Sequence, residues 1–196
     1  MSRLIPSSRS AATFAFVLAL FAALVPAQAD TEINGVRFAD TITIDETPVP
    51  LRGGRLYRYT VFRVYVGALY VPEDVAPQDV LTADVPKRLE LEYLRSISAE
   101  DFRKSGNTLL EDQQSGDTLA ALADRLETFN AAYRDMEAGD RYALEYRPGR
   151  GTRLLQNGTE LVEVPGADFA EAYFGIWLHP DNPLSTRVRD ALIGAS

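Results

Sequence analysis

The sequence predicts an α+β fold built on one antiparallel sheet. Its expected elements follow in the order strands, helices, strands, helices, whereas a parallel sheet alternates strands with helices. No internal repeat, low-complexity tract or linker interrupts residues 30–196. We therefore expect a single domain over that range, large enough to bury a core without cross-links.

The first 29 residues predict a cleaved signal peptide. Arg3 and Arg9 accompany an almost unbroken apolar run over residues 11–25, and Ala27-Gln28-Ala29 offers the small residues that a signal peptidase requires. The apolar run is short for a membrane-spanning helix. We expect cleavage after Ala29, export across a bacterial inner membrane and a soluble periplasmic protein over residues 30–196.

Strands dominate the first part of this domain. Residues 32–38 and 41–44 alternate well enough to form a strand pair, and the prolines and glycines of residues 48–54 predict a connection. Residues 55–72 are rich in Val, Tyr, Phe and Thr, which favour strands. They predict one long strand, or two strands joined by a bend, with both faces covered after Arg63. Arginines and tyrosines set among apolar side chains there suggest the lining of a ligand cavity.

Helices and further strands follow. We expect a short helix over 75–83, a half-buried strand over 86–97, helices from 99 to 112 and from 116 to about 137, strands over 141–147, 152–156 and 159–164, and helices over 167–178 and 183–193. Ser98 begins a capping box for the first long helix, Gly139 is the stop expected for the second, and Asn157-Gly158 predicts a two-residue hairpin turn.

Composition excludes several classes of function. Without Arg3 and Arg9, 18 of the 20 basic residues remain against 28 acidic ones, a net charge of −10. This charge argues against nucleic acid and against an anionic membrane surface as electrostatic partners of the whole protein. The absence of cysteine excludes disulfides and thiolate chemistry.

Few residues offer catalytic or cofactor chemistry. His179 is the only histidine and follows a predicted helix in a turn, which favours a structural role. Gly149-Arg150-Gly151 lacks the strand–turn–helix context of a phosphate loop. The acidic residues are scattered, with no run that has metal-ligand spacing. We expect no metal and no cofactor.

Six blocks of sequence, taken together and in order, resemble the chalcone isomerase-like proteins exported by bacteria. The blocks are residues 62–72 (FRVYVGALYVP), 86–91 (PKRLEL), 97–102 (ISAEDF), 139–142 (GDRY), 148–152 (PGRGT) and 174–185 (FGIWLHPDNPLS). The resemblance implies an open-faced β-sandwich, in which a large antiparallel sheet is covered by a helical layer. A ligand cleft is then expected between the two.

The resemblance also implies candidate site residues. Plant chalcone isomerases use an arginine, a threonine and a tyrosine–asparagine pair. Tyr65 resembles the threonine position, Asn107 the asparagine position and Glu100 the tyrosine position. Arg58 matches the arginine best, with Arg52 and Arg55 as alternatives. Arg58 and Tyr65 fall on opposite faces of a regular strand, so their convergence requires a β-bulge.

Two of these four positions differ from the plant enzymes, so chalcone cyclisation is not expected. The non-enzymatic branch of the family binds fatty acids through an arginine and a tyrosine, and this chain is more similar to that branch. Our principal hypothesis is therefore binding of a small amphipathic ligand, a fatty acid or a phenolic compound. An isomerase or intramolecular lyase with another substrate is the first alternative. A structural or assembly factor, its cleft filled by side chains such as Tyr57, Phe102 and Trp177, is the second.

Overall fold

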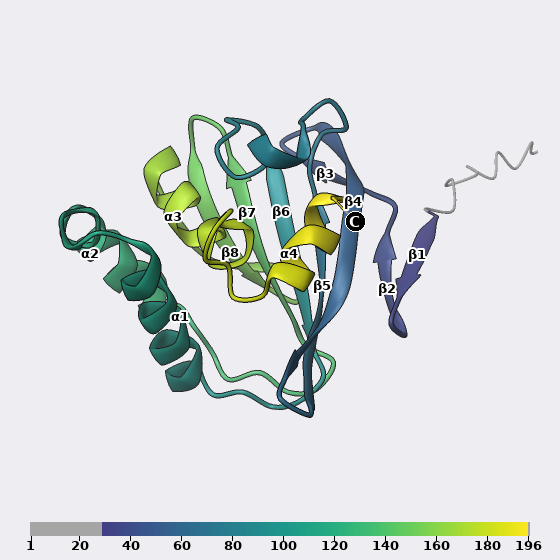
Figure 1. Cartoon of the computed structure of the whole chain (residues 1–196), viewed down its shortest axis with the longest axis horizontal. Coiled ribbons are helices and arrows are strands. Elements are labelled where there is room, and N and C mark those ends of the chain that lie inside the picture. Colours follow the sequence, from purple (N-terminus) through teal and green to yellow (C-terminus); the bar gives the residue numbers. More distant parts are fainter. Residues whose placement is uncertain (1–28, 196) are drawn as a thin grey trace, which may run out of the picture.

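A seven-stranded antiparallel sheet forms the centre of the protein in the computed structural model, which describes residues 29–195 (Figure 1). Its strands lie in the order β3-β4-β5-β6-β7-β8-β9, and β1 and β2 form a separate hairpin. The strands are β1 (Asp30–Ile33), β2 (Val36–Ala39), β3 (Thr41–Ile44), β4 (Thr47–Tyr59), β5 (Phe62–Tyr70), β6 (Lys87–Tyr93), β7 (Arg141–Arg147), β8 (Gly151–Gln156) and β9 (Thr159–Val164). The helices are α1 (Ala99–Gln113), α2 (Gly116–Ala131), α3 (Ala167–Leu178) and α4 (Thr186–Ile193).

The helices cover one face of the sheet (Figure 1). Helix α3 packs on β8, α2 packs beside β9, and α4 packs on β4 and β5, while α1 contacts α3. Leu69, Leu89 and Leu144 supply sheet side chains to this core, and all three are buried. The predicted α+β fold, with one antiparallel sheet under a helical layer, is confirmed.

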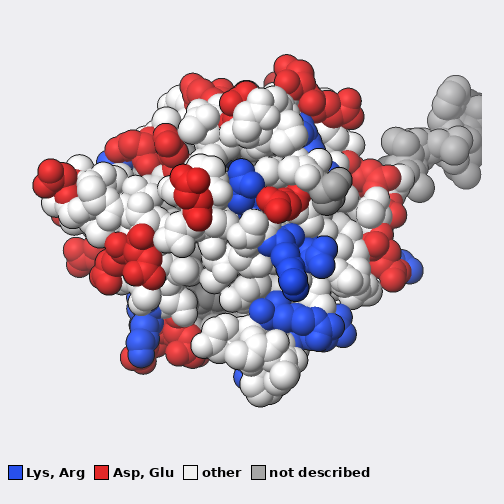
Figure 2. Space-filling view, in the orientation of Figure 1, with Lys and Arg blue, Asp and Glu red and all other residues white. Residues whose placement is uncertain are grey.

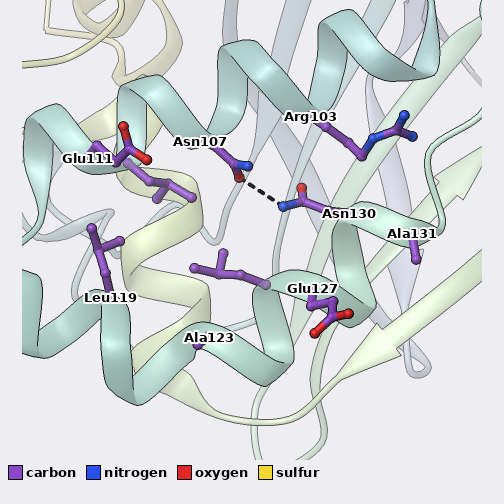
Figure 3. A pocket seen from close by; sticks show the side chains of 10 residues that line it. Arg103, Asn107, Glu111, Leu119, Ala123, Glu127, Asn130 and Ala131 are labelled. Atoms are coloured by element: carbon purple, nitrogen blue, oxygen red, sulfur yellow. Dashed lines mark hydrogen bonds between the residues drawn. The ribbon is translucent and has the colours of Figure 1, made fainter.

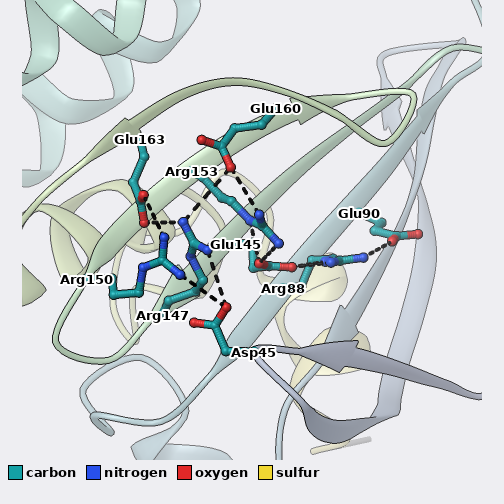
Figure 4. A network of polar contacts seen from close by, with 9 residues as sticks. All are labelled: Asp45, Arg88, Glu90, Glu145, Arg147, Arg150, Arg153, Glu160 and Glu163. Carbon is teal, nitrogen blue, oxygen red and sulfur yellow. Dashed lines mark hydrogen bonds and ion pairs between the residues drawn. The ribbon is translucent and has the colours of Figure 1, made fainter.

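The other face has two parts. Near β4 and β5, the β1–β2 hairpin covers a second core that includes Phe38, Val66 and Tyr70. Both faces of β5 are thus covered after Arg63, as its sequence predicts. Over β6 to β9 this face instead carries a network of arginines and carboxylates around the buried Glu145 (Figure 4).

The first strands differ from the prediction in where they begin and end. Residues 32–38 do not form one strand, because Asn34 and Gly35 take positive φ angles of 51° and 89° and form the β1–β2 turn. Residues 47–54 are part of β4 instead of a connection. The segment 55–72 is divided between β4 and β5 by a turn at Thr60-Val61, which corresponds to two strands joined by a bend.

Three predicted helices are shorter than expected. The last one begins at Thr186, after its N-cap Ser185, instead of at residue 183. Within 75–83 only Pro77–Asp79 is helical, as one 3₁₀ turn. The Lys87 ammonium donates hydrogen bonds of 2.8 to 2.9 Å to the carbonyl oxygens of three residues, Val80, Leu81 and Ala83. These carbonyl oxygens are therefore bonded to a side chain instead of to the backbone N–H groups of a longer helix.

Helix α2 ends at Ala131, not near residue 137. The following chain leaves the helix because Met136 pairs with Ile97 through two backbone hydrogen bonds of 2.9 and 3.0 Å.

The predicted signal peptide lies outside the described residues, apart from Ala29. Strand β1 begins at Asp30, directly after the predicted cleavage position. Over residues 29–195, no helix has both the length and the apolar character that crossing a bilayer requires.

Candidate functional site

A groove of about 490 Å³ lies along the free edge of β4. Strand β3 pairs only with residues 47–50 of β4, so the later part of β4 is not paired with β3. The tip of the β1–β2 hairpin approaches this edge, where the Asn34 side-chain oxygen accepts a hydrogen bond of 3.0 Å from the Leu56 backbone N–H. We call this hollow the arginine groove; it is lined by Asn34, Gly54, Arg55, Leu56, Tyr57, Arg58, Ser185, Arg187 and Val188.

Helix α4 closes the groove from the other side. Gly53 permits this approach, because a Cβ atom at that position would lie 2.2 Å from the Ala191 carbonyl oxygen. Ser185 is the N-cap of α4, where its side chain accepts a hydrogen bond from the Val188 N–H. Arg187 therefore reaches the groove from a part of the chain about 130 residues away from Arg55.

The groove is cationic in an acidic protein. Arg55, Arg58 and Arg187 are exposed, and none of them makes an ion pair or a side-chain hydrogen bond with another described residue. None of the residues that line the groove is a carboxylate. Figure 2 shows basic side chains gathered beside α4, on a face where acidic side chains are otherwise widespread. This arrangement can receive an anion through charge-assisted hydrogen bonds.

The structure separates the three arginines that the sequence left as alternatives. Arg55 and Arg58 line the groove. Arg52 does not, because its guanidinium donates to the carbonyls of Pro72 and Val75 at 2.7 and 3.0 Å. Arg52 thereby connects β4 to the segment 72–75, which follows β5, and has a structural role.

Tyr57 connects the groove with the core. It lines the groove and its ring stacks on Tyr65, with the ring centroids 5.0 Å apart. The Tyr65 hydroxyl is buried and accepts a hydrogen bond of 3.0 Å from the Trp177 indole N–H. Burial raises the pKa of Tyr65 far above its ordinary value, an effect that the Trp177 bond only partly opposes. The hydroxyl therefore stays protonated and is unsuited to act as a base.

The pairing of β4 with β5 is irregular at this point. Tyr57 lies opposite Tyr65 and Arg58 lies opposite Arg63, which leaves Val64 as the extra residue. An irregularity therefore occurs between Arg58 and Tyr65, where the sequence comparison required a bulge. Arg58 nevertheless lines the groove, whereas Tyr65 lies in the core.

Asn107 belongs to a second hollow, of about 520 Å³, between α1 and α2 (Figure 3). The Asn107 side-chain oxygen accepts a hydrogen bond of 2.8 Å from the Asn130 amide. We call this hollow the helix pocket; it is lined by Arg103, Asn107, Leu110, Glu111, Leu119, Ala123, Leu126, Glu127, Asn130 and Ala131. Its aliphatic side chains suit an apolar group, but Glu111 and Glu127 disfavour an anion.

Glu100 lines neither hollow. It is exposed in the first turn of α1, after the N-cap Ser98. The structure thus brings no two of the four predicted residues Arg58, Tyr65, Glu100 and Asn107 to the same hollow. Arg187 was missed, and no local sequence signal marks it, because only the packing of α4 on β4 brings it to the groove.

Aromatic side chains occupy the layer between the sheet and the helices. Tyr93 contacts Phe102 with ring centroids 5.1 Å apart, and Phe102 stacks on Tyr133 at 5.3 Å. Phe102 and Trp177, which the sequence named as side chains that would fill the cleft, both lie against this core.

Comparisons with known proteins agree with this fold. A model of the family described as chalcone isomerase-like matches residues 30–194. The crystal structure of a fatty-acid binding protein of Arabidopsis thaliana is similar, with a TM-score of 0.62 and 14% sequence identity over 82% of this chain and 93% of that chain. No curated protein sequence matches the chain. Since the family match spans every described strand and helix, from β1 to α4, this chain belongs to the chalcone isomerase-like family.

Proposed function

We propose that this protein binds a fatty acid or a similar amphipathic anion, without catalysis, in the bacterial periplasm. The observation that carries the proposal is the arginine groove: three arginines converge there, none has a carboxylate partner among the described residues, and no acidic residue lines the walls. Such a site attracts a carboxylate or phosphate head group.

The walls of the groove also suit a short apolar segment of the ligand. Leu56, Tyr57 and Val188 line it together with the arginines. An amphipathic anion then places its charged head on the guanidinium groups and its tail on these apolar side chains. The volume of about 490 Å³ lies within the usual range of small-molecule sites, roughly 300–1,000 Å³.

Binding is favoured over the isomerase alternative by the chemistry of the walls. No Asp, Glu, His, Cys or Lys is among the residues that line the groove. Arginine does not lose its proton under ordinary conditions and so is a poor general base. A phenolic ligand could be held by the same arginines, but Tyr57 would be the main candidate of the lining for proton transfer, and burial raises its pKa, which disfavours a role as a base.

Periplasmic location is proposed from the first 29 residues. Their charged start, apolar run and Ala27-Gln28-Ala29 end fit a cleaved signal peptide. The start of β1 at Asp30 supports the proposal, because cleavage after Ala29 would remove no part of a strand. Sequencing the N-terminus of periplasmic material tests it: Asp30 is expected, and full-length protein retained in membranes would contradict it.

The binding proposal is tested by titrating dodecanoate into the protein and into the variants Arg55→Ala, Arg58→Ala and Arg103→Ala. A hydrogen bond to a charged group contributes roughly 1.5–3 kcal/mol. Each groove variant should therefore bind about 10- to 100-fold more weakly, since about 1.4 kcal/mol is a factor of ten.

Arg103→Ala is the matched control, because Arg103 lines the helix pocket instead. It should bind like the unchanged protein. Loss of binding in Arg103→Ala alone would move the site to the helix pocket. Normal binding by all three variants, or no binding by the unchanged protein, would overturn the proposal.

A further inference from the structure

An exposed apolar tip closes the hairpin between β4 and β5. Among the described residues, the large hydrophobic side chains that are exposed are Tyr59, Val61 and Phe62, with 66%, 78% and 56% of their surface accessible. We call residues 59–62 the aromatic tip. Such clustering marks an interaction surface, because apolar side chains exposed singly are common but adjacent ones are not.

Positive charge surrounds the aromatic tip. Arg58 and Arg63 flank it in sequence and are exposed, and the guanidinium of Arg95 lies 5.3 Å from the centroid of the Phe62 ring. Arg63 donates to the Asn34 carbonyl at 3.2 Å, and none of these three arginines pairs with a carboxylate among the described residues. In a chain with 28 acidic residues, the segment from Thr47 to Pro72 contains none.

The turn itself is not one that folding favours. Thr60 has a φ angle of 53°, in the left-handed region that β-branched residues rarely adopt. Two of the other two-residue hairpin turns use asparagine and glycine, which tolerate this region better, at Asn34-Gly35 and Asn157-Gly158. The β3–β4 turn uses Asp45-Glu46, and neither of these residues is β-branched. Strained backbone of this kind is concentrated at functional sites.

From these observations we propose that the aromatic tip and its arginines dock on an anionic membrane surface. Tyr is favoured at the level of the lipid head groups, where its ring meets an apolar layer and its hydroxyl a polar one. Phe is typical of the apolar side chains that peripheral segments bury at the head-group boundary. Arginines beside them attract anionic head groups, each contributing about 1 kcal/mol near the surface. The negative net charge of the whole chain argues against such a partner. That charge is a sum over the whole chain, however, and this end of the sheet is positively charged.

The position of the tip suits the exchange of an amphipathic ligand. Arg58 both borders the aromatic tip and lines the arginine groove. Docking through the tip would hold the groove close to the lipid surface. The docking itself does not depend on the proposed fatty-acid binding, since Tyr59, Val61 and Phe62 do not line the groove.

Co-sedimentation with lipid vesicles tests the proposal. The chain from Asp30 onward is used, because it contains every described helix and strand and lacks the apolar run 11–25. Vesicles of phosphatidylcholine alone are compared with vesicles that also contain one quarter phosphatidylglycerol. Binding to the anionic vesicles only, weakened by added salt, is expected.

Two variants locate the contact. Tyr59→Ser combined with Phe62→Ser should reduce vesicle binding at least tenfold. Arg63→Gln should reduce it about fivefold, the factor that corresponds to 1 kcal/mol.

Arg150→Gln is the matched control. Arg150 is exposed and lies at the opposite end of the sheet from the aromatic tip. The end of β5 away from the tip is Tyr70, which lies opposite Arg88 of β6. Arg88 in turn lies opposite Glu145, near the end of β7, and Arg150 follows that end. Its removal should leave vesicle binding unchanged.

The result separates this inference from the proposed function. If the unchanged protein does not bind anionic vesicles, or if the tip variant binds them as well as the unchanged protein, the inference is overturned. Normal dodecanoate binding in either case leaves the proposed function intact. Vesicle binding without dodecanoate binding would support the inference and overturn the proposed function.

Discussion

Two parts of the same sheet use arginine in opposite ways. On the outer face of β6 to β8, Glu145 is fully buried and accepts hydrogen bonds of 2.6 Å from both Arg88 and Arg153 (Figure 4). Arg147 is buried beside them and pairs with Asp45 and Glu163. At the edge of β4, by contrast, Arg55, Arg58 and Arg187 surround a groove with no carboxylate in its walls.

The hairpin turns of the two parts also differ in how well their residues suit the backbone conformation. The β8–β9 hairpin turns at Asn157-Gly158, which suits its positive φ angles, and Asn157 also accepts a hydrogen bond from the Arg141 N–H. The β4–β5 hairpin turns at Thr60-Val61 between exposed aromatic residues. Where local chemistry and fold agree, a region serves stability, and a region that departs from the rules is a candidate for function.

The first prediction concerns the buried carboxylate. Glu145→Ala leaves the charges of Arg88 and Arg153 without their shared partner, and breaking a buried pair costs about 3–5 kcal/mol. The free energy of unfolding, measured in urea, should fall by that amount. Arg150→Gln, whose partners Asp45 and Glu163 are more exposed, should cost less than about 1 kcal/mol. Equal losses in the two variants would remove the distinction between a buried network and surface pairs.

The second prediction separates Arg52 from its neighbour Arg55. Arg52→Ala removes bonds to the carbonyls of Pro72 and Val75, so the free energy of unfolding should fall by roughly 1.5–3 kcal/mol. Arg55→Ala removes no partner among the described residues and should change it by less than about 0.5 kcal/mol.

The same two variants should behave in the opposite way in a titration with dodecanoate. Arg52→Ala, studied where it is folded, should bind like the unchanged protein, whereas Arg55→Ala should not. A stability loss in Arg55→Ala as large as that in Arg52→Ala would mean that the groove arginines are structural.

The third prediction tests whether binding in the groove depends on the negative charge of the ligand. Dodecanol has the same tail as dodecanoate but no charge, and it should bind at least about tenfold more weakly. The arginines stay charged over the accessible pH range. Dodecanoate affinity should therefore be constant above about pH 5 and decrease as the pH falls through the ordinary carboxyl range, roughly 4–5.

Dodecanol supplies the control for pH, because its affinity should not change over the same range while the protein stays folded. Arg58→Ala should weaken dodecanoate and leave dodecanol unaffected. If the variant weakens both ligands equally, Arg58 acts through packing and not through its charge.

The fold was predictable because its signals are local or repeat along the chain. The cap at Ser98, the turn at Asn157-Gly158 and the alternation in residues 87–93 each depend on a few neighbouring residues, and each is present in the structure. The end of α2 was not predictable in this way. Its residues keep a helical spacing, but a pairing of Met136 with Ile97, about 40 residues away, takes the chain out of the helix.

The candidate site was predictable only in part, for the same reason. The family resemblance named Arg58, with Arg52 and Arg55 as alternatives. The sequence did not show that the Arg52 guanidinium is already bonded to backbone carbonyls. Arg187 enters the groove only through the packing of α4 on β4. Family positions alone suggested Glu100 and Asn107, which the structure places apart from the groove.

The last and smallest expected effect concerns the strained turn. Asparagine tolerates the left-handed region better than a β-branched residue does. Thr60→Asn should therefore raise the free energy of unfolding by about 0.5–1 kcal/mol, measured in urea. Thr159→Asn is the control, because Thr159 is also an exposed threonine beside a hairpin turn but lies outside the left-handed region, so that no gain is expected.

Since Thr60→Asn keeps Tyr59, Val61 and Phe62, it should still bind anionic vesicles. A gain in stability with vesicle binding retained would show that the strain belongs to the turn alone, whereas unchanged stability would contradict the assignment of strain to Thr60. If vesicle binding is lost as stability rises, the strained conformation itself presents the aromatic residues to the membrane.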